Sequence, residues 1–425
     1  MSGEPDAGLK SSYYLLMVYA ALFGAFSSLL TVGYITLYNQ GVKFFEQGNL
    51  FVFNINIWPL VLLTGAGILI GLAIKFFGKH GGLGVVQREY AQTGRLNYRN
   101  TPSIMLQAFI ALWSGAAVGP EAPLVFLNGG VGSFVSVRLK LQKDDIQVLV
   151  YSSLAGAFGA FIGSPIIGAI AAYEYMFIRE LNFYRHVIPG LVAAAVGYGI
   201  YGLILQNAFL GVYSFPDYPS LELGDLWWAL LVGLIAGVIG IMYKLIFGIV
   251  NLVFIRLTKR PVVCAIIGGV ILGLIGSFLP LTLYSGQDQL LQIIHNPAAF
   301  GIGILLLLLL VKTVMTSTSF ATGFVGGPIF PLLFVGGTLG LAISKILTFI
   351  PEGVAVTAGM AGVACAVFPL PLTIILLLGL LGGQTDLLPG IAVGAVVGLL
   401  VSKALTHLLP KRGTKSGSSA ESQTN

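Results

Sequence analysis

The sequence predicts an all-helical protein that crosses a membrane many times, and three observations support this prediction. Of the 425 residues, 56% are hydrophobic and only 9% are charged, which is more apolar surface than a water-soluble core could bury. Apolar stretches of about 20 residues, the length of a membrane span, recur along most of the chain. The 57 glycines and 19 prolines fall largely within these stretches, as expected of helices that pack closely or stop midway.

The apolar stretches predict about ten or more membrane segments, several of them broken into shorter pieces. The first begins after MSGEPDAGLKSS and has no small-residue cleavage site, so we expect it to remain as a membrane helix. Residues 1–13 and 411–425 are polar and are predicted to be disordered, which leaves a transmembrane domain at residues 14–410. The stretches lie at residues 14–39, 56–77, 103–118, 147–177, 188–206, 226–255, 262–280, 301–320, 328–349 and 354–402.

The positive charges occur as short runs between apolar stretches. The net charge of +6 comes mainly from Arg138–Lys143, Arg256–Arg260 and the segment KRGTK near the C-terminus. The positive-inside rule places these runs, and both termini, on the cytoplasmic side of the cell membrane. Because the charges are scattered and form no basic face, we expect no nucleic-acid partner.

The residue types disfavour an enzyme or a metalloprotein. The histidines are far apart and show no metal-ligand spacing, and no nucleophile with a base stands out. Cys264 and Cys365 lie in apolar surroundings and are expected to pack in the core. Lys312, within LLLLLLVKTVMT, is expected to extend toward a membrane interface. We expect no catalytic residues, no metal site and no cofactor. The four histidines are His80, His186, His295 and His407.

The two halves of the chain repeat each other. The segment GPEAPLVF at 119–126 recurs as GPIFPLLF at 327–334, with five of eight positions identical and a Gly-Gly pair after each. A second match in register relates residues 155–165 to residues 361–371. Two matches in register indicate a duplication, with halves at about 14–205 and 225–405. Duplicated halves with broken helices are typical of transporters and channels, and the sequence leaves open whether the halves are parallel or inverted.

The broken segments favour an anion as the transported ion. A helix that begins inside the membrane presents unpaired N–H groups and the positive end of its dipole. Glycine followed by proline suits such a start, and several of these starts could bind one anion without a fixed positive side chain. Segments of this form follow Gly119 and Gly327, and Gly82-Leu83-Gly84 and Gly163-Ser164-Pro165 have the same form.

Glu121 lies in the first of these segments, between Pro120 and Pro123. An ionisable side chain in a membrane segment is costly and is functional by default. A carboxylate at an anion site can occupy the place of the anion while charged and leave it when protonated. Glu121 is therefore the candidate gate, proton carrier or both.

At these residues the chain resembles the CLC family of chloride channels and proton-coupled chloride transporters. Gly119-Pro120-Glu121-Ala122-Pro123 is similar to the family's GxExP motif, with Ala122 where glycine is usual. The other two pore motifs have altered counterparts in the same order. They are Gly82-Leu83-Gly84-Val85-Val86 and Gly327-Pro328-Ile329-Phe330-Pro331.

The resemblance implies two inverted helical halves whose broken helices meet at an anion site near the midplane. It implies a homodimer with one pore in each subunit, and it makes Glu121 the gating glutamate. The anion-binding positions would be Gly82, Leu83, Gly84, Gly119, Ala122, Ile329 and Phe330. The cytoplasmic regulatory domains of many eukaryotic members have no counterpart in this sequence.

The chain departs from the family in places that bear on mechanism. The inward-facing glutamate of proton-coupled members aligns with Tyr175, and Glu174 is one residue away, so both are candidates for a proton pathway. The family's pore tyrosine near the C-terminus has no counterpart, because no tyrosine follows Tyr284. Leu83 replaces the serine that faces the anion, as in fluoride-exporting relatives.

The expected activity is thus passage of chloride or a similar small anion, as a channel of the voltage-gated chloride type or as an anion/proton antiporter. A fluoride/proton antiporter of the same family is the first alternative. An unrelated secondary transporter is the second, because many such proteins share duplicated halves and broken helices.

Overall fold

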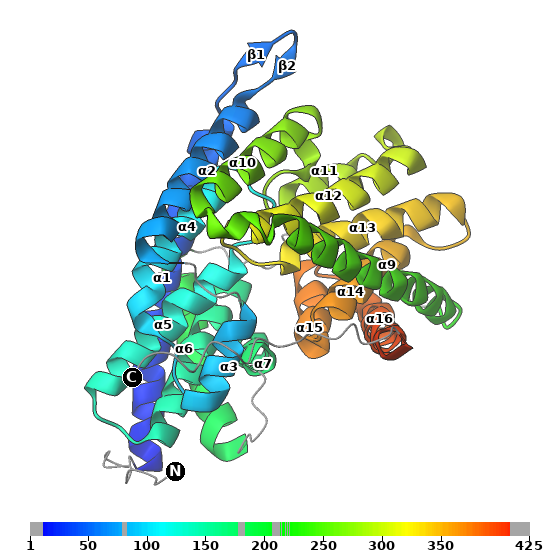
Figure 1. Ribbon diagram of the computed structural model, residues 1–425. Coiled ribbons are helices and arrows are strands. Elements are labelled where there is room, and N and C mark those ends of the chain that lie inside the picture. Colours follow the sequence, from blue (N-terminus) through cyan, green and yellow to red (C-terminus); the bar gives the residue numbers. More distant parts are fainter. Residues whose placement is uncertain are drawn as a thin grey trace.

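The protein is a bundle of tilted helices in the computed structural model (Figure 1). The structure describes residues 12–78, 83–176, 183–205, 213, 215, 216, 218, 220 and 222–408. Most of the predicted disordered termini, residues 1–11 and 409–425, therefore lies outside the described residues. The only sheet within the described ranges is a two-stranded hairpin of β1 (Phe51–Val52) and β2 (Ile55–Asn56), which projects from one end of the bundle.

The α-helices within the described residues fall into two series of eight. The first series is α1 (Tyr13–Glu46), α2 (Trp58–Phe77), α3 (Leu83–Thr93), α4 (Thr101–Trp113), α5 (Glu121–Arg138), α6 (Lys143–Ile162), α7 (Pro165–Met176) and α8 (Ile188–Leu205). The second is α9 (Asp225–Phe254), α10 (Pro261–Phe278), α11 (Gln287–His295), α12 (Ile302–Thr322), α13 (Ile329–Ile346), α14 (Glu352–Val367), α15 (Pro371–Leu381) and α16 (Leu388–Leu408). Single helical turns lie at Tyr98–Asn100, Phe183–Val187, Leu257–Lys259, Pro280–Thr282, Pro297–Ala299 and Thr385–Leu387.

The first helix shows why these residues form membrane helices. It begins at Tyr13, where the Ser12 hydroxyl accepts a hydrogen bond from the N–H of Leu15. The buried face of α1 carries small and polar residues, and Ser27 shares a hydrogen bond of 2.7 Å with Ser153 of α6. The opposite face exposes large apolar side chains such as Leu22 and Leu29. This arrangement, with small residues inside and large apolar residues outside, suits a helix surrounded by lipid.

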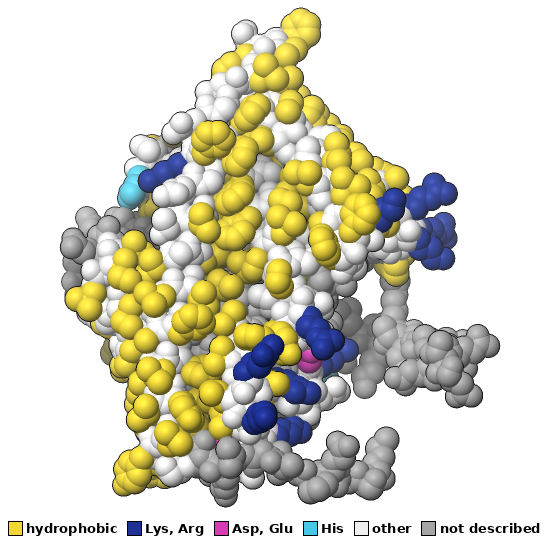
Figure 2. Space-filling view, turned by 90° about the vertical axis from the view of Figure 1, so that its left-hand side faces the viewer, with side chains coloured by type: hydrophobic (Ala, Val, Ile, Leu, Met, Phe, Trp, Pro, Cys, Tyr) yellow, Lys and Arg dark blue, Asp and Glu magenta, His cyan; other side chains and the backbone are white. Residues whose placement is uncertain are grey.

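Nine helices within the described residues are long and apolar enough to cross a membrane, and two shorter apolar helices accompany them. The predicted stretch 147–177 divides into α6 and α7, because Gly163 adopts a left-handed conformation and Pro165 begins the next helix. The stretch 354–402 divides into α14, α15 and α16. The prediction of broken segments is therefore confirmed. Figure 2 shows hydrophobic side chains over much of one face.

Close helix packing recurs in the two series. In the first, a side-chain carbon added to Gly156 of α6 would overlap the backbone of Gly24 in α1, and one added to Gly197 of α8 would overlap Gly156. In the second, an added carbon at Gly398 of α16 would overlap Gly362 of α14. The triad α1, α6 and α8 thus corresponds to the triad α9, α14 and α16, as a duplication predicts.

The described chain ends lie on the same side as the basic loops. Leu141, in the loop of Arg138–Lys143, packs with Leu16 and Phe23 near the start of α1. Helix α2 begins beside the end of α1, where the Trp58 side chain donates to the carbonyl of Phe45 at 2.7 Å. Arg256–Arg260 leads into α10, whose Val262 packs against Gly71 near the end of α2, so this basic loop lies on the side where α1 begins. Helix α16 runs parallel to α9, since Gly233 faces Gly394 and Lys244 bonds Ser402 at 2.9 Å. The positive-inside rule makes this the cytoplasmic side.

Candidate functional site

Two helices begin where the halves of the protein meet. Helix α5 starts at Glu121, directly after Gly119-Pro120, and α13 starts at Ile329, directly after Gly327-Pro328. Proline suits this place because it has no N–H to leave unpaired at the start of a helix. Both helices have most of their residues buried, so their first N–H groups open inside the protein and away from solvent.

Gly119 and Gly327 form an antiparallel pair. The N–H of each donates to the carbonyl of the other, and both N···O distances are 2.7 Å. Equivalent residues of two repeats that pair reciprocally in antiparallel directions are related by a local twofold axis. The equivalent membrane helices α2 and α10 pack antiparallel, since Gly71 faces Val262 and Gly273 faces Leu60. Equivalent helices run in opposite directions only when the twofold axis lies in the membrane plane, so the halves are inverted, as the family resemblance implies.

The carboxyl group of Glu121 lies at the start of the opposite helix. Its Oε1 accepts a hydrogen bond of 2.6 Å from the N–H of Ile329, and the N–H groups of Glu121 and Phe330 also face the carboxyl group. The residue is 2% exposed, and its Oε2 has no hydrogen-bond partner among the described residues. The side chain thus stands in for a small anion between two helix N-termini.

The two glycines make room for this carboxyl group. A side-chain carbon added to Gly119 or to Gly327 would overlap atoms of the Glu121 side chain, and the three nearest atoms at each glycine all belong to Glu121. Ala122, the second residue of α5, is 1% exposed and packs in the core. Glycine is therefore needed at both positions to fit the carboxyl group, whereas Ala122 contributes to the walls.

Aromatic side chains from three other helices surround the helix starts. The hydroxyl of Tyr34 in α1 donates to the carbonyl of Pro120 at 2.8 Å. The ring of Phe161 in α6 packs edge-on against Phe330, with centroids 6.5 Å apart. One turn earlier in α6, Phe158 packs against Tyr175 at 5.2 Å. No pattern in the sequence singled out Tyr34 or either phenylalanine of α6, because apolar and aromatic residues are common throughout the chain.

Glu174 and Tyr175 point to different surroundings. Glu174 accepts hydrogen bonds from the N–H groups of Leu372, at 3.1 Å, and Thr373, at 2.7 Å, and so caps the start of α15. Tyr175 is 2% exposed, and its hydroxyl has no partner among the described residues. These two candidates therefore lie in contact with different helices although they are adjacent in sequence.

The predicted anion-binding segment Gly82-Leu83-Gly84 lies only partly within the described residues. Gly82 lies outside the described residues, Leu83 is the first residue of α3, and Gly84 follows it at an exposed position. Helix α3 is joined to α7 by a hydrogen bond of 2.7 Å from the Gln87 side chain to the carbonyl of Tyr175. Of the predicted anion positions, the structure thus brings together Gly119, Ala122, Ile329 and Phe330, with the predicted gate Glu121 among them.

The expectation that Lys312 extends toward a membrane interface is wrong. Its amine does not extend toward an interface, because the residue is fully buried. The amine donates to the carbonyls of Thr282, Leu283 and Tyr284 at 3.0, 3.0 and 2.7 Å, and it lies 5.2 Å from the centre of the Phe334 ring. The carbonyls at the end of the turn Pro280–Thr282 supply the acceptors that water would supply at a membrane interface.

The sequence of the chain matches the model of a known protein family. A family model described as "Voltage gated chloride channel" matches residues 66–403. The chain belongs to the CLC family. The matched range includes both helix starts of the candidate site, and CLC proteins are transporters and channels of anions rather than enzymes. Membership in this family sets aside the alternative of an unrelated secondary transporter.

Named relatives agree with the CLC assignment. The chain is 27% identical over 314 residues to the "Putative ion-transport protein YfeO" of Escherichia coli (strain SMS-3-5 / SECEC), covering 73% of each chain. It superposes on a slow cyanobacterial Cl⁻/H⁺ antiporter with a TM-score of 0.79 at 20% identity, covering 95% of this chain and 96% of the other. For a CLC-type fluoride/proton antiporter the TM-score is 0.74 at 19% identity, with 93% and 98% covered. These two likenesses show the CLC fold.

Proposed function

We propose that the protein carries chloride or a similar small anion across the cell membrane in exchange for protons, with Glu121 as the gate. The observation that carries the proposal is the Glu121 carboxyl group at the N–H of Ile329, 2.6 Å away. A group held there competes with any anion for the starts of α5 and α13.

Protonation of Glu121 weakens the hydrogen bond that holds its carboxyl group at the start of α13. A carboxylate accepts a strong, charge-assisted hydrogen bond from Ile329, and a protonated carboxyl group accepts a weaker one. When Glu121 binds a proton, an anion can therefore displace it from the helix starts. The proton then leaves on the side opposite to the one from which it came, which couples proton movement to anion movement.

The choice between chloride and fluoride rests on the family resemblance at one position. Leu83 stands where a serine usually faces the anion, and fluoride-exporting relatives also have an apolar residue there. One solved relative is a fluoride/proton antiporter and another a chloride/proton antiporter. Chloride remains the first candidate and fluoride the second.

The experiment is an anion-flux assay with simultaneous pH recording, using purified protein in liposomes and either chloride or fluoride as the gradient. We expect a chloride gradient to drive protons uphill. Anion flux without proton movement would identify a channel, and a response only to fluoride would identify the alternative substrate. If neither anion moves through monodisperse protein, the proposed function is wrong.

The proposal includes a homodimer in which each subunit has its own anion pathway, as the family resemblance implies. The mass of the detergent-solubilised protein tests this part separately. A monomeric mass with intact anion flux would remove the dimer from the proposal and leave the transport function in place.

A further inference from the structure

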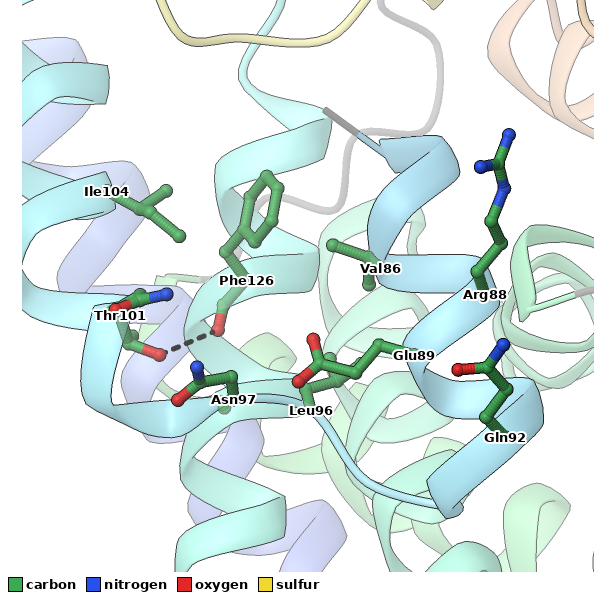
Figure 3. A pocket seen from close by; sticks show the side chains of 11 residues that line it. Val86, Arg88, Glu89, Gln92, Leu96, Asn97, Thr101, Ile104 and Phe126 are labelled. Carbon is green, nitrogen blue, oxygen red and sulfur yellow. Dashed lines mark hydrogen bonds between the residues drawn. The ribbon is translucent and has the colours of Figure 1, made fainter. Parts of the chain in front are cut away.

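A cavity of about 380 Å³ opens beside α5, the helix that carries the candidate gate. It lies between α3, the segment that leads to α4, and the facing side of α5 (Figure 3). Val86, Ile104 and Phe126 form its apolar part, and polar side chains including Gln92 and Asn97 form the rest. At about 30 Å³ for each water molecule, the cavity has room for roughly ten waters.

Contacts around α3 place the cavity on the cytoplasmic side. The amine of Lys143 donates to the carbonyl of Gln92 at 3.1 Å, and the hydroxyl of Tyr90 donates to the carbonyl of Gln147 at 2.9 Å. Lys143 ends the basic loop that packs beside the start of α1. Water that enters the cavity therefore comes from the side of the basic loops.

Glu89 projects its carboxyl group into this cavity. The side chain extends from α3 toward Leu96 and Asn97 (Figure 3). Glu89 is half-buried, and no ion pair among the described residues includes it. Arg88 is the other charged residue of the lining, and the lining residues of α4 and α5 are uncharged.

The inner wall of the cavity belongs to the helix that carries the gate. Phe126 and Gly130 of α5 line the cavity, and α5 begins at Glu121. Phe126 lies five positions after Glu121, a rise of about 7.5 Å along the helix axis. The cavity wall at Phe126 thus lies about one and a half turns of helix from the residue that carries the gate.

Glu174 is less suited to deliver protons to the gate. Both of its oxygens accept backbone N–H groups at the start of α15, which stabilises its charged form in place. Glu89 has no such ties and lies in a cavity of its own.

We propose that Glu89 is the inward proton-exchange site of this transporter. Its carboxylate takes a proton from cytoplasmic water in the cavity and passes it on toward the carboxylate of Glu121, further along α5. Only O–H bonds break and form, and Glu89 returns to the carboxylate. This inference rests on the proposed anion/proton exchange and adds the group through which the cytoplasmic proton enters.

The test compares Glu89→Gln with wild-type protein in liposomes under a chloride gradient, with anion and proton fluxes recorded together. We expect proton flux to fall at least tenfold while anion flux stays within about twofold of wild type. Glu89→Asp should restore part of the proton flux, because it returns a carboxylate to the cavity.

Asn97→Trp, which fills the cavity and leaves Glu89 in place, should slow protons more than anions. Glu46→Gln, an exposed glutamate at the other end of α1, is the matched control and should change neither flux.

Three results would overturn the assignment of Glu89. The first is a proton flux in Glu89→Gln equal to that of wild type, and the second is a fall of both fluxes in the same proportion. The third is a wild-type protein that moves anions without protons, which overturns the exchange site and leaves anion transport standing. A protein that moves no anion contradicts the proposed function itself, so the two failures are distinguishable.

Discussion

The Glu121 side chain and the Ile329 backbone join the two halves of the protein through one hydrogen bond of 2.6 Å, although 208 positions separate them in sequence. Each half supplies what the other lacks. The first half has the carboxyl group, and the second half offers an unpaired helix start with no acid of its own. The site therefore exists only when both halves fold against each other.

Replacing Glu121 by Gln should make anion flux faster and nearly independent of pH. The amide resembles the protonated acid, binds Ile329 more weakly than the carboxylate does, and cannot regain a charge. Wild-type flux should rise as the pH falls, because protonation frees the helix starts, and the two proteins should converge at low pH. Flux recorded from pH 4 to 8 checks this, and an unchanged pH profile in the variant would contradict the gating role.

Gly327→Ala should displace the Glu121 side chain and raise the flux. The added carbon would overlap the carboxyl group, and the three nearest atoms all belong to Glu121. The matched background is Glu121→Ala, which removes those atoms. There, Gly327→Ala should have almost no effect on flux, whereas additive effects in the double variant would mean that the two residues act independently.

Glu174→Gln should weaken the start of α15 without abolishing proton coupling. The amide can accept one of the two N–H groups and presents its own donors to the other, so we expect a loss of about 1–2 kcal/mol in stability. Thermal unfolding in detergent measures the loss, and the proton-flux assay measures the coupling. Stable protein that has lost only its proton flux would instead make Glu174 a proton carrier.

Lys312→Met should destabilise the protein by about 2–5 kcal/mol, because three buried carbonyls lose their shared donor. The loop that contains these carbonyls is also bonded to the segment between α4 and α5, because the N–H of Tyr284 donates to the carbonyl of Gly115 at 3.0 Å. Lys345→Met, which removes a lysine from the last turn of α13, is the control. Equal stability of the two variants would show that the buried amine is dispensable.

Much of this architecture follows from local sequence. Hydrophobic stretches predicted the membrane helices, and the Gly-Pro pairs predicted helix starts after Gly119 and Gly327, where α5 and α13 begin. Glycine and proline act through the backbone of their immediate neighbours, so their effect can be read from the sequence. The family resemblance, carried by the same residues, led to the assignment that the family match confirmed.

Other features depended on contacts between distant segments. The sequence assigned Lys312 to an interface, because it could not show that three carbonyls from residues 282–284 would enclose the amine. It also left Glu89 unnoticed, since a glutamate in the polar helix α3 has no distinctive neighbours. The role of Glu174 as a cap of α15 depended on residues 198 and 199 positions away.

By itself, the sequence determined the membrane class, the duplication, the broken helices and the single acid between two prolines. Each of these is a property of composition or of residues close together in the chain. Only the tertiary structure decided that Glu121 lies on the helix start of the opposite half, and that Glu89 faces a cavity beside α5. These relationships join segments far apart in the chain, and burial and hydrogen bonding between such segments are set by packing rather than by local pattern.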